Sequence, residues 1–338
     1  MALSKITNAS VADTAVHGRR NLIINGAMQI SQRGTDINDI ASDSTYIADR
    51  FRTRDYGGAG QYNYDQVTDV VPADFKYATK LEVDTAASDV GTYGYALEHH
   101  IEGYNISQLN LGTSNAKSFT ISFWARSSLA GTYSSGVRTT SAEYSYHTEF
   151  TLAANTWKYI TYTVPPLTSS LSSLDTTNGT GLIVDIVGFA KQTSKVVSNL
   201  DTWESGNSIW STNQTDWMGT AGNTFHITGV QLEVGDKATP FERRSYGEEL
   251  SLCQRYYEAF SGLAIFTKGR ESDRLRYVMN YYKVNKRTTP TVSISGTADG
   301  SSFSTNTDSS VAAFRTQCTG SDDGSTPYYT SATIDAEL

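Results

Sequence analysis

Aromatic side chains carry the clearest candidate chemistry in this sequence. Three of the five tryptophans, Trp203, Trp210 and Trp217, recur within residues 199–223, a loop-like segment rich in Ser, Thr, Asn and Gly. Proteins hold sugars by stacking the CH faces of the ring on Trp and Tyr, while amides and acids bind the hydroxyls. One interpretation is therefore a glycan-binding loop. The other is that these rings plug the ends of a sandwich or a subunit interface, where large aromatics are also common.

Two predicted strands add further candidates. Apolar and polar side chains alternate over residues 118–126, which is the period of a half-buried strand, and Trp124 and Arg126 fall on the polar face. Tyr144 and Tyr146 share one face of a second predicted strand and form either a stacking platform or a packing pair. The complete set of candidate ligand-binding residues is Trp203, Trp210, Trp217, Tyr144, Tyr146, Trp124 and Arg126.

Motifs for catalysis and metal binding are absent from the sequence. It contains no HExxH, CxxC or GxSxG string and no GxxxxGK[ST] phosphate loop. The adjacent His99 and His100 must point to opposite faces if they lie on a strand, so they cannot easily chelate one ion. The sequence therefore predicts no cofactor and no metal.

Carboxylate pairs need separate consideration, because glycosidases use two acids about 5 to 10 Å apart. Glu98 and Glu102 could project from one edge of a strand, and Asp322 and Asp323 lie together in a predicted turn. Spacing alone does not separate a catalytic pair from solvated surface acids. We therefore predict no enzyme and no catalytic residue.

Composition and charge exclude several classes of partner. The net charge is −8, so the basic field that drives nucleic-acid binding is missing. No apolar run is long enough to span a bilayer and no signal-peptide core is present, so we expect a protein that is made and kept in a cytosol, without membrane insertion. The two cysteines, Cys253 and Cys318, are expected to be free thiols.

The order of strand-like and turn-like segments predicts an all-β protein, with an antiparallel sandwich favoured over an α/β fold. Residues 21–30 are expected to contribute to this strand and turn pattern, Gly229 to mark a β-bulge and Ser245 to cap a short helix. The predicted parts are an N-terminal arm at 1–20, a sandwich domain at 21–244, a short helical linker at 245–258 and a small C-terminal β-domain at 259–338.

Four segments resemble one known family. They are NLIINGAMQISQRG at 21–34, IEGYN at 101–105, SFTISFWARSS at 118–128 and FHITGVQLEVGDKATPFERRSYGEELSLCQRYYE at 225–257. Together they resemble phage tail-fibre or virion fibre proteins whose central domain is similar to jelly-roll carbohydrate-binding modules. The resemblance covers roughly the first three quarters of the chain.

The resemblance implies a central jelly roll that adheres to host surface glycans without catalysis. It also implies an N-terminal arm that docks on other virion proteins, a homotrimer, and location in the virion after assembly in the host cytoplasm. Trp157 resembles the tryptophan that begins a core strand in such modules, which implies a packing role. Members often carry a structural calcium, but no acid-rich loop in this sequence has a spacing that supports one.

Three alternatives remain open at this point. The protein could be a capsid head fibre or a decoration (cement) protein with a purely architectural role. It could be a polysaccharide depolymerase whose acids lie in a groove between subunits. It could also be a cellular carbohydrate-binding module, which the absence of a secretion signal disfavours.

Overall fold

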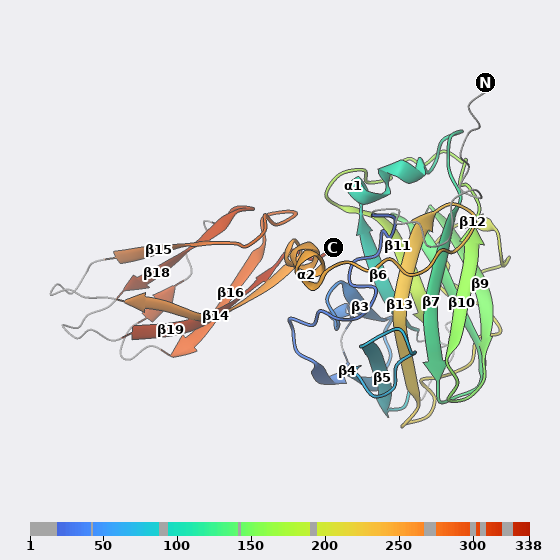
Figure 1. Ribbon diagram of the computed structural model, residues 1–338, viewed down its shortest axis with the longest axis horizontal. Coiled ribbons are helices and arrows are strands. Elements are labelled where there is room, and N and C mark those ends of the chain that lie inside the picture. Colours follow the sequence, from blue (N-terminus) through green and yellow to red (C-terminus); the bar gives the residue numbers. More distant parts are fainter. Residues whose placement is uncertain are drawn as a thin grey trace, which may run out of the picture.

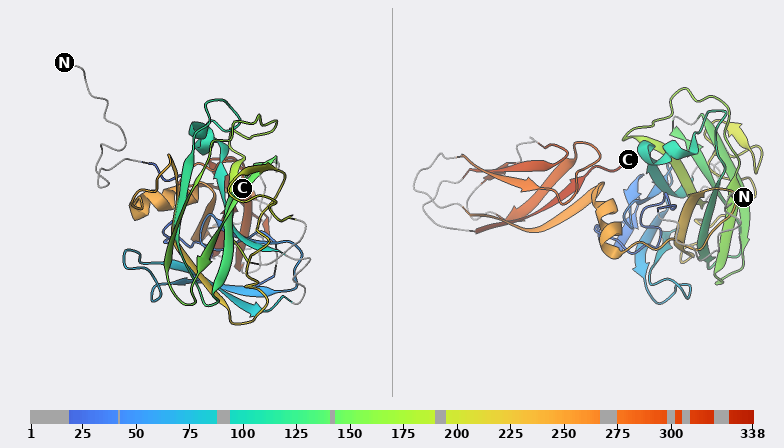
Figure 2. Two further views of the ribbon diagram at one scale, coloured as in Figure 1. Left: turned by 90° about the vertical axis from the view of Figure 1, so that its right-hand side faces the viewer. Right: turned by 45° about the horizontal axis from the view of Figure 1, so that its top comes forward.

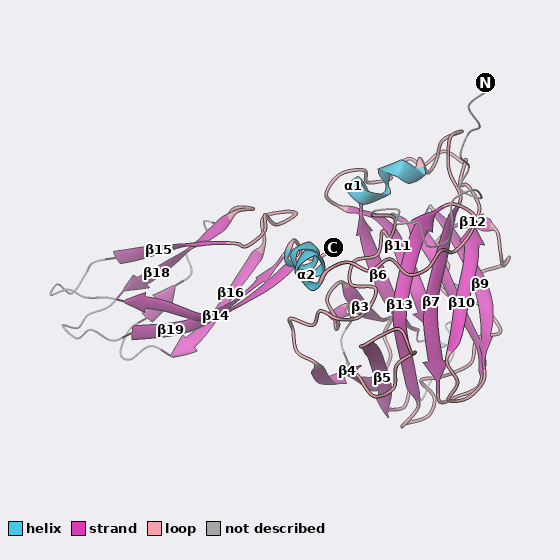
Figure 3. Cartoon of the chain, in the orientation of Figure 1, coloured by secondary structure: helices cyan, strands magenta, loops and turns pink. Residues whose placement is uncertain are grey.

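The protein consists of antiparallel β-sheets arranged as a broad two-layer sandwich and a narrower pair of small sheets (Figures 1 and 3). The computed structural model describes residues 19–41, 43–87, 94–140, 143–189, 195–266, 275–297, 302–304, 309–319 and 327–338. This confirms the predicted all-β class. Nearly all of the predicted arm at 1–20, as well as Asp322 and Asp323, lies outside these residues.

Two sheets form the sandwich. The six-stranded sheet has the order β1-β4-β5-β13-β7-β10, with β1 (Asp36–Ile40), β4 (Gln61–Val67), β5 (Ala78–Thr85), β13 (Thr224–Val234), β7 (Phe119–Ser127) and β10 (Lys158–Val164). The seven-stranded sheet has the order β12-β9-β8-β11-β6-β3-β2, with β12 (Trp203–Ser205), β9 (Tyr144–Leu152), β8 (Gly131–Thr139), β11 (Thr180–Gly188), β6 (Tyr95–Glu102), β3 (Phe51–Asp55) and β2 (Thr45–Tyr46). Strands distant in sequence are neighbours in both sheets, as in the predicted jelly roll.

The core lies between the inner faces of these two sheets. On β7 the alternation predicted from the sequence sends Phe119, Ile121 and Phe123 inward, where all three are fully buried. Aromatic rings from both layers meet there, with centroids of Phe123 and Phe150 at 5.7 Å in an edge-to-face contact. Burial of these rings is the main source of stability for the sandwich.

The predicted bulge at Gly229 is confirmed. The pairing of β13 with β7 shifts register between Thr228 and Gln231, and Gly229 between them has a φ of +66°. A Cβ atom on Gly229 would come within 2.6 Å of the Phe75 ring, so glycine is required both by the backbone conformation and by the close packing.

Residues 21–30 form turns and no strand. Asn25, with a φ of +61°, accepts a hydrogen bond from the Ile30 amide and donates from its own side chain to the Ile30 and Asp49 carbonyls. Its backbone amide donates to Glu249 at 2.6 Å. The segment is buried because its asparagine supplies, locally, the hydrogen bonds that a strand would take from a neighbour.

A capped helix follows the sandwich. Helix α2 (Tyr246–Gln254) begins after Ser245, whose hydroxyl accepts from the Glu248 amide, as predicted. Two shorter elements, α1 (Gly103–Ile106) and the 3₁₀ helix η2 (Ser107–Leu109), follow β6. Beyond α2 lie two three-stranded sheets: β14 (Tyr257–Phe266), β19 (Pro327–Asp335) and β16 (Thr291–Thr297) in one, and β15 (Leu275–Tyr281), β18 (Ala313–Thr319) and β17 (Ser302–Ser304) in the other.

The end of the chain returns to the sandwich, although the two small sheets project away from it (Figure 2). Arg50 and Glu337 form an ion pair with both side chains buried. Arg52 and the Tyr46 hydroxyl donate to an oxygen of Leu338. These contacts attach the base of the C-terminal sheets to β2 and β3.

The structure also bears on the two cysteines and on the helices. Cys253 is a free, fully buried thiol, and burial raises its pKa well above the usual value. The side chain of Cys318 lies outside the described residues. Within the described ranges, none of the helices has the length and apolar character to cross a membrane.

Candidate functional site

The outer face of the six-stranded sheet carries a cluster of partly exposed aromatic rings. We define the aromatic platform as Trp124 and Arg126 on β7, Tyr159 on β10, Trp157 just before β10, and His226 on β13. The alternation on β7 directs Trp124 and Arg126 outward, because Phe123 and Ala125 point into the core. These strands lie side by side along one layer of the sandwich (Figure 1).

Strand register brings the members of the platform together. Tyr159 pairs directly with Trp124, and their ring centroids are 5.3 Å apart with an interplanar angle of 46°. His226 pairs with Arg126 from the other side. The Trp157 and His226 rings meet edge to face at 6.2 Å. Two ring pairs, Trp124 with Tyr159 and Trp157 with His226, therefore lie on neighbouring strands of the same sheet face.

The exposed parts of the platform rings are suited to stacking against a sugar ring. Tyr159 is 40% exposed, Trp124 and Trp157 are half-buried, and His226 lies beneath them at 4% exposure. Rings that are fixed by packing on one side and open on the other lose little side-chain entropy when a ligand stacks on them. A sugar ring laid on Trp124 and Tyr159 would meet such a surface.

The charges of the platform come from Arg126 alone. Burial, helped by Arg126 and Lys80, lowers the pKa of His226 to about 4, so the imidazole is neutral at pH 7. Arg126 donates from Nε and Nη2 to the carbonyl and side-chain oxygens of Asn155, both at 3.1 Å, and forms no ion pair with a described residue. A held guanidinium beside the rings can donate hydrogen bonds to a ligand oxygen.

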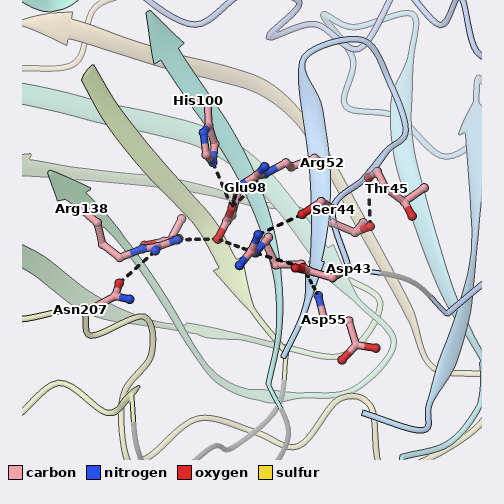
Figure 4. A network of polar contacts seen from close by, with 12 residues as sticks. Asp43, Ser44, Thr45, Arg52, Asp55, Glu98, His100, Arg138 and Asn207 are labelled. Atoms are coloured by element: carbon pink, nitrogen blue, oxygen red, sulfur yellow. Dashed lines mark hydrogen bonds and ion pairs between the residues drawn. The ribbon is translucent and has the colours of Figure 1, made fainter. Parts of the chain in front are cut away.

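The opposite outer face, on the seven-stranded sheet, carries a buried ionic network instead (Figure 4). Arg138 on β8 donates from Nε and Nη2 to the two carboxylate oxygens of Asp185 on β11, both at 2.8 Å. The same guanidinium pairs with Glu98 on β6, which also binds Arg52 at 3.1 Å and His100 at 3.2 Å. All of these side chains are nearly excluded from solvent.

The network keeps the Glu98 carboxyl ionised. Although burial opposes ionisation of Glu98, Arg138 and His100 hold the pKa of that carboxyl well below its usual range. Burial lowers the pKa of His100 to about 4. A glycosidase acid needs a raised pKa in order to carry a proton. Glu98 lacks this property, and Glu102 is held by Arg255 and Tyr256 at the join to α2. These carboxylates hold the fold together.

The three loop tryptophans have packing positions. Trp210 and Trp217 are fully buried, with Trp217 packed against Phe189 in the sandwich core and Trp210 against Tyr56. Trp203 is partly buried, and its indole donates to the Pro165 carbonyl at 2.7 Å. A buried ring offers no face to a sugar, so the positions of Trp210 and Trp217 favour the packing interpretation for these two residues, whereas Trp203 stays partly exposed beside Tyr146.

The predicted tyrosine pair also lies against the core. Tyr146 is 3% exposed and stacks on Tyr162 at 6.4 Å, while Tyr144 is partly buried against the same cluster. Of the residues predicted to bind a ligand, Trp124 and Arg126 lie together, partly exposed, on the outer face of the six-stranded sheet.

The platform members missed from the sequence are Tyr159, Trp157 and His226. Trp157 was expected to have a packing role, and it packs edge to face against His226 on the outer face while its ring stays partly exposed. Alternation along residues 157–164 could have placed Trp157 and Tyr159 on the same face. Their partnership with Trp124 depends on strand pairing, which has no local signal.

Among the described residues, no group of three or more His, Cys, Asp or Glu side chains is arranged to hold an ion. The calcium implied by the family resemblance therefore has no candidate ligand set of this kind in the described part of the chain.

No protein-family model matches the chain, and no curated protein matches it. Solved structures similar to the chain include carbohydrate-binding modules. An arabinose-bound α-L-arabinofuranosidase, MgGH51, shares 12% identity over 64% of this chain with a TM-score of 0.36, and the match spans only 26% of that enzyme. The CBM22-1 xylan-binding domain of Xyn10C from Paenibacillus barcinonensis shares 10% identity with a TM-score of 0.29, covering 60% of this chain and 94% of that one.

A third structure, TmCBM61 in complex with β-1,4-galactotriose, shares 12% identity with a TM-score of 0.30, covering 64% of this chain and 99% of that one. At these identities and TM-scores the likeness says nothing about what this chain binds. The virion-fibre family, the arm and the trimer stay predictions.

Proposed function

We propose that the protein is a non-catalytic attachment protein that binds glycans through the aromatic platform. The observation that carries the proposal is the pair of Trp124 and Tyr159, two partly exposed rings in contact across paired strands. Trp157 extends this surface, and Arg126 adds a donor at its side. Flat aromatic surfaces with a few polar groups at the edge match the CH faces and hydroxyls of sugars.

Other ligand classes fit this surface less well. A net charge of −8 opposes phosphate-rich nucleic acid. The platform has one cation and a neutral histidine, so it lacks the charge cluster that recognises acidic peptides. Its partly exposed rings lie on β7 and in or just before β10, neighbouring strands about 4.8 Å apart, which suits a short run of sugar units.

The finer biological role follows from the family resemblance. We propose a short tail fibre or receptor-binding subunit of a phage virion, docked through residues 1–20 and assembled as a homotrimer. A shallow sugar site binds weakly, and several linked copies raise the avidity by about 10² to 10⁴. An architectural capsid decoration protein is the alternative that predicts no glycan binding.

The test is binding of the purified protein to host cells and to a glycan array, with released sugar assayed in the same samples. The variant carries Trp124→Ala and Tyr159→Ala, and the control carries Tyr104→Ala, an exposed tyrosine on α1. We expect the double variant to lose at least about 30-fold in affinity, equivalent to about 2 kcal/mol, and the control to bind as the wild type does.

Full binding by the folded double variant would show that the platform is not the site. Release of sugar would make the protein an enzyme, and absence of binding by the wild type would favour the architectural role.

A further inference from the structure

Arg126 brings a positive charge to the aromatic platform and has no counter-ion among the described residues. Its Nε and Nη2 atoms donate to the backbone and side-chain oxygens of Asn155, and these two bonds occupy one edge of the guanidinium. Arg52, Arg138 and Arg255, by contrast, each pair with a carboxylate. Within the described part of the chain, the second edge of the Arg126 fork, formed by Nη1 and Nη2, therefore keeps its N–H donors for a ligand.

The turn that precedes β10 fixes the position of this guanidinium. Asn155 has a φ of +57°, a left-handed conformation that asparagine tolerates, and its backbone amide donates to the Ser127 carbonyl at 2.6 Å. The same residue thus ties the turn to the end of β7 and holds the side chain of Arg126. A side chain that is already held loses little rotamer freedom when a ligand binds.

Strand register places Arg126 among the rings of the platform. The pairing of β10 with β7 begins at Lys158, and continuing it by one residue places Trp157 opposite Arg126. His226 pairs with Arg126 from the other side. Trp124 lies two residues earlier on the same face of β7, about 7 Å away along the backbone. A pyranose stacked on Trp124 can therefore direct an exocyclic group toward the guanidinium.

The neighbouring charges on this face leave Arg126 as an uncompensated cation. Lys80, which pairs with His226, is held by Asp65 at 3.2 Å and by Glu82 at 2.5 Å, so these acids are engaged with the lysine. Burial, together with Arg126 and Lys80, lowers the pKa of His226 to about 4, so the imidazole adds no charge at pH 7. The rings therefore surround one fixed positive charge.

We infer that the platform selects glycans that carry a carboxylate, such as uronic or sialic acid units, with the sugar ring stacked on Trp124 and the carboxylate bound by Arg126. The inference rests on the proposed function. A guanidinium fork matches a planar carboxylate through two parallel hydrogen bonds, and such charge-assisted bonds are stronger than bonds between neutral groups. The net charge of −8 opposes an anionic ligand only weakly, because physiological salt screens exposed charges beyond about 8 Å.

The test compares acidic sugars with neutral copies of themselves, using the full-length protein. The probes are trigalacturonate, trimannuronate and sialyllactose, each beside its methyl ester, and titration calorimetry and ligand-observed NMR give the affinities. We expect the acid that binds best to bind about tenfold more tightly than its ester. Arg126→Gln should remove this difference and leave the affinity for the ester nearly unchanged, which also shows that the variant is folded.

Two further variants separate the fork from the charge alone. Lys117→Gln removes one positive charge from an exposed residue just before β7, about 30 Å from Arg126 along the strand, and should leave the preference for the acid intact. Arg126→Lys keeps the charge without the planar fork and should retain only part of the preference.

The outcomes distinguish this inference from the proposed function. If Trp124→Ala abolishes binding while the wild type binds acid and ester equally, the platform stands and the carboxylate preference is overturned. A preference for the acid that persists in Arg126→Gln, or that Lys117→Gln reduces to the same extent, would also overturn it. Binding of neutral array glycans with no binding of any acid would do the same. If neither the probes nor any array glycan binds, both proposals fail.

Discussion

The two outer faces of the sandwich arise from the same alternation of side chains but differ in solvent exposure. On the seven-stranded sheet the outward residues are Glu98, Arg138 and Asp185, and they are buried beneath covering segments such as the one that carries Trp210. On the six-stranded sheet the outward residues include Trp124 and Tyr159, which remain partly open. A polar strand face is therefore no guide to exposure, because long loops decide which face stays accessible.

The comparison also separates stability from binding. Removing one partner from a buried ion network leaves an uncompensated charge, whereas removing an exposed ring costs little in folding. Mutations on the covered face should therefore change the free energy of unfolding, and mutations on the open face should change affinity.

Arg138→Ala should cause the largest loss of stability. Because Glu98 and Asp185 would then lie buried without their shared cation, we expect the free energy of unfolding to fall by about 3 to 5 kcal/mol. Denaturant unfolding measures this, with Arg126→Ala on the open face as the matched control, expected to change stability by less than about 1 kcal/mol. Equal effects of the two substitutions would remove the contrast between the faces.

Trp210→Ala should cause the next largest loss in the free energy of unfolding, about 3 kcal/mol, because it leaves a cavity over the covered face beside Tyr56 and Ile209. Glycan binding by the folded fraction should stay unchanged. Weaker binding at unaltered stability would instead assign this loop tryptophan to the site.

The pH dependence should be about 2 kcal/mol for each of two histidines between pH 7.5 and pH 5. His100 and His226 have a pKa of about 4 in the folded protein and about 6.5 when unfolded, so the unfolded chain binds more protons between these values. Stability is therefore fully present above pH 6.5 and falls as the pH drops toward 4. Unfolding at pH 7.5 and pH 5 should show this fall, and it should be smaller in the His100→Gln, His226→Gln double variant. If the stability of that variant fell with pH as steeply as that of the wild type, these two histidines would not be the cause of the fall.

The smallest expected change in stability is that of Trp157→Ala, below about 1 kcal/mol, since the ring is half-buried on the outer face. Its glycan affinity should nevertheless fall several-fold. A loss of stability above about 3 kcal/mol would instead show that Trp157 serves mainly in packing, as the resemblance implies.

Local patterns predicted much of the fold. Alternation placed Trp124 outward on β7, the Ser245 hydroxyl indicated the start of α2, and the change of phase around Gly229 indicated the bulge, because each depends on residues close in sequence. For residues 21–30 the sequence indicated a pattern of strand and turn but not that the segment forms turns alone, because Asn25 also bonds to Asp49 and Glu249, which are distant in sequence. The domain boundaries at 244 and 258 remain predictions.

The site was only half predictable. Trp124 and Arg126 followed from alternation, but Tyr159 joins them through the register of β7 with β10, which no short segment encodes. Burial of Trp210 and Trp217 likewise depends on what the loop covers.

Hydroxyl-radical footprinting of the protein with and without its best-binding glycan tests the central claim most directly. The account predicts that the glycan protects Trp124, Trp157 and Tyr159 from oxidation, while the exposed Tyr104 and Tyr246 react equally in both samples. Protection of Tyr104 or of Trp203, with Trp124 and Tyr159 unprotected, would contradict it and move the site away from the six-stranded sheet.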